Sequence, residues 1–259
     1  MTGKVYLIGA GPGAADLITL RGARVLAQAD IVFYDALVQL DLWALAPQAQ
    51  HVAVGKRCRQ LSTDQRFINR ALVEAAQRHN VVVRLKGGDA TLFGRVQEEI
   101  ATLRDAGIVY EIVPGVTSAL AASAELGISL TQRGVSRSVV FVTPRVGEGE
   151  SASDWIKSVL AADTAVLYMA SGQADEIAAR LMQHGLVGST PVALVSQASL
   201  PNMQKAVTTL SNLHEAAQNA GSPALIILGE VLRAYALGTS TQEISEEISQ
   251  LIHPVGIYA

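Results

Sequence analysis

LIGAGPGAADLITL, residues 7–20, joins a short apolar strand to a stretch with helical periodicity. The spacing of Gly9, Gly11 and Ala14 fits the G-x-G-x-x-G/A turn that binds dinucleotide phosphates between a strand and a helix. Pro12 weakens this interpretation, because a phosphate is held by backbone N–H groups and proline has none. A tight turn that requires glycines is the structural alternative.

The first half of the chain alternates short Val- and Ile-rich segments with longer amphipathic ones. The apolar segments are continuous, as parallel strands buried on both faces require, so the pattern predicts β-α units. The predicted strands are residues 4–9, 31–34, 51–54, 81–85 and 109–113. The predicted helices are residues 16–28, 36–45, 62–79 and 93–106.

A second group of strands follows the Pro-Gly turn in VPGVTS. SVVFVT, TAVLYM, PVALVS and PALIILG are apolar, whereas KAVTTL (205–210) alternates like an antiparallel edge strand. We therefore predict two α/β domains, with a mostly parallel sheet in residues 1–114 and a mixed sheet in residues 115–240. A polar tail occupies residues 241–259.

The composition predicts a globular protein rather than a nucleic-acid or membrane binder. The 259 residues are 49% hydrophobic and 17% charged, with a net charge of -3 and scattered basic residues. The single cysteine and the five histidines show no metal-ligand spacing, so no metal site is expected. Without a signal peptide or a long apolar segment, the expected location is the cytoplasm.

Ligands of open α/β sheets bind at the carboxyl ends of the strands, so the segments that follow strands are the candidates for function. Asp35 ends the second predicted strand, at the distance expected of a ribose-binding acid. It could also cap the next helix or accept a proton. Lys56 and Arg57 follow the third strand, and they suit an anionic substrate, a proton transfer or simply a solvated loop.

RLKGGDATLFGRVQEE, which includes the end of the fourth predicted strand, is the most informative segment. Gly87 and Gly88 allow the chain to turn with its backbone exposed to a ligand. Asp89 offers a carboxylate to an amine or a hydroxyl, and Arg95 and Glu98 lie three residues apart on the predicted helix. A dinucleotide-dependent enzyme has no need for this combination.

Together, GAGPGAADLITL, YDALV, VGKR, VVRLKGGDATLFGRVQEE, VPGVTSA and LYM have the order and spacing found in the tetrapyrrole (class III) methyltransferases. The chain resembles this family over roughly residues 3–238. The resemblance implies a two-domain α/β homodimer that binds S-adenosylmethionine in a folded conformation between its domains, with no metal. The GGD…FGR..EE segment favours the members that add two methyl groups to uroporphyrinogen III, giving precorrin-2 for sirohaem, cobalamin or haem d1.

The resemblance also implies roles for individual positions. Asp35 is the candidate proton acceptor, Lys56 the candidate donor and Arg95 a rival for substrate activation. The implied substrate-binding residues are Arg95, Glu98, Arg133 and Met169, with help from Arg57 and Arg59. The implied cofactor-binding residues are Pro12, Gly87, Gly88, Asp89, Leu92, Thr117, Ser118, Met169, Ala198 and Ala224.

Several positions depart from the usual pattern of the family. Val96 and Gln97 replace a small glycine pair, and we expect them to add bulk near the substrate. The other departures are Ala90, Thr91, Gln132, Thr143-Pro144-Arg145 and Ala198.

The sequence is also compatible with other functions. Within the fold, the alternatives are a methyltransferase for a later precorrin and a more distant relative that acts on an amino acid or an RNA nucleotide. The absence of a basic surface disfavours RNA. Outside this fold, the glycine spacing and Asp35 are compatible with a dinucleotide-dependent oxidoreductase. The departures from the family pattern are compatible with a tetrapyrrole-binding protein that has no catalytic activity.

Overall fold

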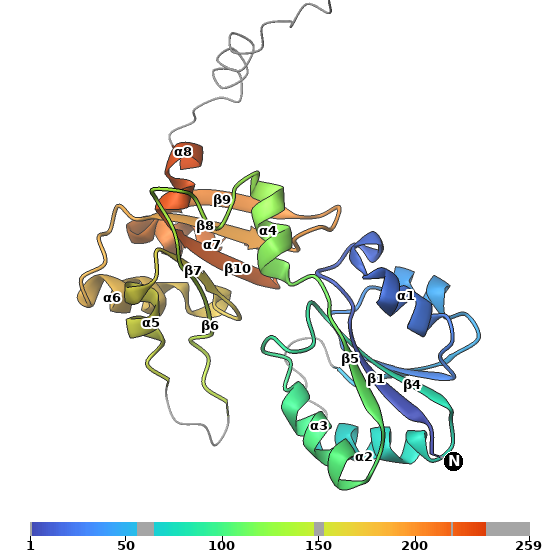
Figure 1. Cartoon of the computed structure of the whole chain (residues 1–259). Helices are drawn as coiled ribbons and strands as arrows, with labels where there is room; N and C mark the ends of the chain where they lie inside the picture. The colour runs from blue at the N-terminus through green and yellow to red at the C-terminus, as the bar shows by residue number, and fades with distance from the viewer. Residues whose placement is uncertain (1, 56–64, 148–152, 219, 237–259) are drawn as a thin grey trace, which may run out of the picture. The chain divides into compact units, whose positions relative to one another are not determined.

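The computed structural model describes residues 2–55, 65–147, 153–218 and 220–236 (Figure 1). These residues form two compact units. The described residues up to 125 and the segment Gln197–Met203 form the first unit, and the other described residues form the second. Each unit has its own five-stranded sheet. The predicted α/β class with one parallel and one mixed sheet is confirmed, whereas the boundary at residue 114 stays a prediction.

The first sheet is entirely parallel, in the order β3-β2-β4-β1-β5. Its strands are β1 (Lys4–Gly9), β2 (Ile31–Tyr34), β3 (Gln50–Ala53), β4 (Val81–Lys86) and β5 (Tyr110–Val113). All five lie within a residue or so of the predicted ranges, because continuous apolar segments are typical of strands covered on both faces. Strand β4 occupies the centre of the sheet.

Helices cover both faces of this sheet, as Figure 1 shows. The face that includes Val82 packs against α2 (Gln65–Ala76) and α3 (Val96–Asp105). The face that includes Val83 packs against α1 (Leu20–Leu26). Adjacent residues of β4 therefore enter opposite cores, and every side chain of its central part is buried.

Two helix predictions in this unit need correction. The predicted helix at residues 36–45 is wrong in type, because only the six-residue 3-10 helix η2 (Leu40–Leu45) forms there. No side chain caps its start, and Pro47 follows closely and cannot donate the next helical hydrogen bond. The predicted helix at residues 16–28 is interrupted after η1 (Ala15–Leu17). The α-helix α1 starts at Leu20, and the side chain of Thr19 caps its N-terminus.

The second sheet is mixed, in the order β6-β7-β10-β8-β9, with only β6 and β7 parallel. The strands are β6 (Val139–Val142), β7 (Thr164–Leu167), β8 (Pro191–Ser196), β9 (Gln204–Thr209) and β10 (Ala224–Gly229). The predicted antiparallel edge strand is confirmed as β9. The remaining helices are α4 (Ser118–Leu126), α5 (Trp155–Ala161), η3 (Ser171–Gln173), α6 (Ala174–Gln183), η4 (Leu210–Asn212), α7 (Leu213–Gln218), η5 (Glu230–Leu232) and α8 (Arg233–Ala236).

The predicted tail at 241–259 and the start of the predicted helix at 62–79 fall outside the described residues. Within the described ranges, no helix combines the length and the apolar character that crossing a membrane requires. The same ranges contain no group of three or more His, Cys, Asp or Glu side chains that could hold a metal ion.

Close backbone packing at the end of β1 leads to a first prediction. A Cβ added to Gly9 would lie 2.6 Å from the Cα of Gly115 and 2.6 Å from the carbonyl oxygen of Gly88, so the backbone would have to move. We expect Gly9→Ala to lower the free energy of unfolding by about 1–3 kcal/mol, measured by urea denaturation. Gly172→Ala is the matched control, because nothing lies within 4 Å of the added Cβ there. Equal stability of the two variants would contradict the prediction.

Candidate active site

The loops that follow β1, β4 and β5 are joined at the carboxyl edge of the first sheet. Gly11 and Gly88 exchange two backbone hydrogen bonds, of 3.2 and 2.7 Å. The Asp89 carboxylate accepts a hydrogen bond of 2.8 Å from the N–H of Gly115. The sequence-predicted positions at the ends of these strands are therefore brought together, and they hold one another in place.

Several backbone donors of the loop after β1 are already engaged by other parts of the protein. The N–H of Ala10 donates to the carbonyl of Lys86, and that of Gly11 donates to Gly88. The N–H of Ala14 donates to the Ser199 hydroxyl at 3.0 Å, and Pro12 has no N–H. Because a pyrophosphate is held through such groups, this loop disfavours the dinucleotide interpretation.

The segment Gln197–Met203 packs against this loop, although it is distant in sequence. Gln197 and Ser199 have φ values of 53° and 69°, a backbone region that residues other than glycine seldom adopt. Leu200 reaches so close to Gly13 that a Cβ there would lie 2.8 Å from its Cγ. Ala198, a predicted cofactor residue, is buried within this strained turn. The sequence does not predict this contact, because no local pattern indicates it.

Asp89 connects the loop after β4 to the loop after β5. Its Oδ1 accepts hydrogen bonds from the backbone N–H and the hydroxyl of Thr91, and its Oδ2 accepts from Gly115. Partial burial raises the pKa of Asp89, but the hydrogen bonds from Thr91 and Gly115 outweigh it and hold the pKa below its usual value. Three of about four acceptor positions of the carboxylate are used, so one position on Oδ2 remains for a ligand.

These hydrogen bonds predict a pH-dependent contribution of Asp89 to stability. Because the folded-state pKa is lowered, the contribution is complete above the usual carboxyl pKa of about 4 and disappears as the pH falls through the folded value. We expect Asp89→Asn to cost about 1 kcal/mol at pH 7, after allowance for solvent screening, and less below pH 4. Urea denaturation at several pH values measures the difference, with the exposed Asp41→Asn as control. A cost that is constant with pH would refute this assignment.

Arg95 lies at the start of α3 in an unusual backbone conformation. Its φ is 54°, and that of nearby Phe93 is 53°. Such values are common at functional sites. The Arg95 side chain is exposed, and its Nε and Nη2 atoms donate to the two oxygens of Glu98 at 2.7 and 2.8 Å. The structure therefore brings these two predicted substrate residues together at the surface.

The departure at Val96 and Gln97 affects this surface less than expected. Val96, the first residue of α3, is 8% exposed and packs in the core that α2 and α3 form with the first sheet. Gln97 is exposed. The added bulk of Val96 therefore fills the core.

A network of four charged side chains joins β4 to α3 and to the end of β2. Arg84 and Lys86, both on β4, are each 2% exposed, and Glu99 of α3 is fully buried. Glu99 Oε1 accepts hydrogen bonds from Arg84 Nε at 3.0 Å and from Lys86 Nζ at 2.9 Å. Arg84 also forms an ion pair with Asp35, at the end of β2. The charges of this network balance.

The pKa values of the two buried cations shift in opposite directions. Burial, and then the nearby charge of Arg84, lower the pKa of Lys86. Burial alone would lower the pKa of Arg84, but the negative charges of Asp35 and Glu99 outweigh it and raise this pKa. Arg84 therefore stays charged. It pairs with the carboxylate of Asp35, the residue that the sequence suggested as a ribose-binding acid or a proton acceptor.

Arg84 and Lys86 were not among the residues predicted to have a function. The signal was present, because VVVRLK places two charges at alternate positions of a strand that is otherwise apolar. Alternate positions face the same side of a sheet, so these charges had to be buried and paired.

The other predicted site residues of the first unit lie along the same segments. Pro12, Gly87, Gly88, Leu92, Thr117 and Ser118 are all partly accessible. A Cβ on Gly88, which has a φ of +68°, would meet only the Cα of Thr117, at 4.0 Å. This open space between two predicted cofactor positions is compatible with a ligand. Lys56, Arg57 and Arg59 fall outside the described residues.

Three predicted residues belong to the second unit. Met169 follows β7, is exposed and has a φ of 55°. Arg133 is exposed in a turn that is closed by two backbone hydrogen bonds between Gln132 and Ser136. Ala224 is buried at the start of β10.

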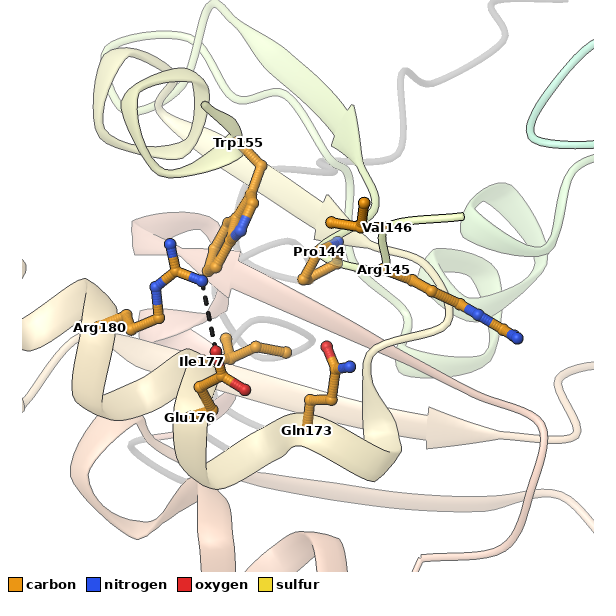
Figure 2. A pocket seen from close by; sticks show the side chains of 8 residues that line it. All are labelled: Pro144, Arg145, Val146, Trp155, Gln173, Glu176, Ile177 and Arg180. Carbon is orange, nitrogen blue, oxygen red and sulfur yellow. Dashed lines mark hydrogen bonds and ion pairs between the residues drawn. The ribbon is translucent and has the colours of Figure 1, made fainter. Parts of the chain in front are cut away.

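The second unit also contains a cavity of about 340 Å³, shown in Figure 2. It is lined by Pro144, Arg145, Val146, Trp155, Gln173, Glu176, Ile177 and Arg180. Arg180 lies over the Trp155 ring and pairs with Glu176 at 3.4 Å, so its charge is already engaged. None of the residues predicted to bind substrate or cofactor lines this cavity.

Comparison with known proteins places this chain among enzymes of one family. The family model for Tetrapyrrole (Corrin/Porphyrin) Methylases matches residues 4–214. The uroporphyrin-III C-methyltransferase of Thermus thermophilus, solved with S-adenosylhomocysteine, is 40% identical, with a TM-score of 0.79. The match covers 90% of this chain and 100% of that one. A cobalt precorrin-4 methyltransferase is 30% identical, with a TM-score of 0.77 and coverages of 88% and 95%.

Curated relatives include longer proteins. Siroheme synthase 1 of Klebsiella pneumoniae is 42% identical over 235 residues, which are 90% of this chain and 50% of that protein. The siroheme synthase of Neisseria meningitidis serogroup B is 44% identical over 231 residues, with coverages of 89% and 48%. The chain thus spans about half the length of these curated relatives.

Proposed function

The chain belongs to the tetrapyrrole (corrin/porphyrin) methylase family, and we propose that it methylates uroporphyrinogen III with S-adenosylmethionine as the methyl donor. The products are precorrin-2, after two transfers, and S-adenosylhomocysteine. The observation that carries the proposal is the carboxyl edge of the first sheet. There the N–H groups of Ala10, Gly11 and Ala14 are engaged within the protein and Pro12 has none, while the loop of Gly88 and Asp89 leaves space and one acceptor position for a ligand.

S-adenosylmethionine supplies an electrophilic methyl group on a sulfonium. The ring of Pro12 offers an apolar wall without a competing donor. The free acceptor position on Asp89 Oδ2 suits an ammonium group, and Gly88 permits close approach to the backbone. Leu92, Thr117, Ser118, Met169, Ala198 and Ala224 complete the proposed set of cofactor residues.

The chain's task in the reaction is largely positioning. A porphyrinogen ring is electron-rich, so the protein must align a ring carbon with the methyl group and remove one proton. We propose Asp35 as the group that accepts this proton and Lys56 as a proton donor. Arg95 contributes to substrate activation. Arg133, together with Arg95, Glu98 and Met169, binds the carboxylate-bearing substrate, for which a guanidinium is well suited.

Two measurements test this function. Calorimetric titration should show binding of S-adenosylhomocysteine and none of NAD; binding of NAD alone would overturn the proposal. Incubation with uroporphyrinogen III and S-adenosylmethionine should add two methyl groups by mass. Transfer to a later precorrin but not to uroporphyrinogen III would keep the family and change the substrate.

We further propose that the enzyme is a homodimer located in the cytoplasm, with its product used for sirohaem, cobalamin or haem d1. The family resemblance supports the dimer. Light scattering of the purified protein should give twice the chain mass, and a monomer that is active would contradict it.

A further inference from the structure

The charged network of Arg84, Lys86, Glu99 and Asp35 costs free energy to bury, so its presence in the core requires an explanation. Arg84 and Lys86 occupy core positions on the α2 and α3 side of the central strand, where apolar side chains are the usual choice. Replacing buried ion pairs by apolar residues of similar volume is often neutral or stabilising, so stability alone does not require these charges.

The network runs from the core to the surface. Lys86 and Arg84 both donate to Oε1 of Glu99, whose Oε2 has no hydrogen-bond partner among the described residues. Arg84 Nη1 donates to the carbonyl of Leu85 at 3.2 Å, which fixes the plane of the guanidinium further. Only the last member, Asp35, is accessible, with 29% of its side chain exposed.

We infer that Arg84 is a positioning residue, which fixes the Asp35 carboxylate at the end of β2 for its encounter with substrate. Glu99 holds the guanidinium from the other side, through Nε, while Nη2 is directed to Asp35. A guanidinium can bridge two carboxylates in this way because its donors have a rigid planar arrangement. The inference rests on the proposed function, in which Asp35 accepts the proton.

The test replaces Arg84 by lysine, which keeps a positive charge beside Glu99 but has a single ammonium in place of the fork. We expect kcat for methyl transfer to uroporphyrinogen III to fall about 10- to 100-fold, because small displacements of a reacting group have effects of this size. The affinity for S-adenosylhomocysteine should change less than twofold. Arg104→Lys, the same change at an exposed position of α3, should have no effect.

A double-mutant cycle separates positioning from a structural role. If Arg84 acts through Asp35, then adding Arg84→Lys to Asp35→Asn should cause no further loss of kcat. Losses that multiply, or an Asp35→Asn variant with full activity, would overturn the inference. If Arg84→Lys does not fold, Glu99→Gln replaces it in the same cycle, because it removes a charge and keeps the side-chain shape.

A crystal structure of the Arg84→Lys variant gives a readout that needs no substrate. The Asp35 carboxylate should be displaced or turned relative to the unmodified protein, and an unchanged carboxylate would overturn the inference. If the unmodified protein does not methylate uroporphyrinogen III, the proposed function fails by that assay. The crystal structures would then still decide whether Arg84 positions Asp35.

Discussion

Glu99→Leu should lower the free energy of unfolding by about 3–5 kcal/mol, the largest effect on stability that we expect from a single substitution in this chain. Glu99 is fully buried, and its Oε1 accepts hydrogen bonds from Arg84, Lys86 and Gln65. Its removal leaves two buried cations next to each other with only Asp35, at the end of the network, to compensate. Urea denaturation at neutral pH measures the loss.

Two further variants show whether unpaired charge causes this loss. Glu98→Leu makes the same change one residue away, where the side chain is exposed, and should cost less than about 1 kcal/mol. In the double variant Lys86→Met with Glu99→Leu, a cation leaves together with its anion, and stability should recover in part. If the double variant were less stable than Glu99→Leu alone, unpaired charge would not be the cause.

The sequence predicts the strands of both sheets well, because each is a continuous apolar segment or a clear alternation. The helices are less predictable. Residues 36–45 have apolar spacing compatible with an α-helix, but the hydrogen bonds available before Pro47 support only a short 3-10 helix. Apolar periodicity does not report how many backbone donors and acceptors a segment can pair.

How well the site could be predicted depends on whether its contacts are local or distant in the sequence. Gly88, Asp89 and Arg95 could be selected because they follow a strand in one short segment. The contact between Ser199 and Ala14 could not, because it joins residues 185 positions apart. The pairing of Arg84 with Asp35 depends on the order of the strands, which places β2 beside β4. Sequence periodicity contains no information about this order.

Arg95→Ala should abolish precorrin-2 formation, with a decrease in kcat of at least about 100-fold, which is typical for loss of a group that stabilises charge in the transition state. The side chain is exposed at the carboxyl edge of the first sheet, and two of its nitrogens are already directed by Glu98. A guanidinium carries its N–H donors in a rigid planar arrangement that matches a carboxylate, so an exposed arginine here suits a carboxylate-bearing substrate. Mass spectrometry of the reaction products measures the methyl groups added.

The same variant should bind S-adenosylhomocysteine with an affinity within about twofold of the unmodified protein, because we place Arg95 against the substrate rather than the cofactor. Arg104→Ala, on the solvent side of α3, is the matched control and should retain full activity. Stability should change little, since the pair of Arg95 with Glu98 is exposed to solvent and contributes at most about 1 kcal/mol. Full activity of Arg95→Ala would remove Arg95 from the catalytic set, and parallel loss of S-adenosylhomocysteine binding would move it to the cofactor site.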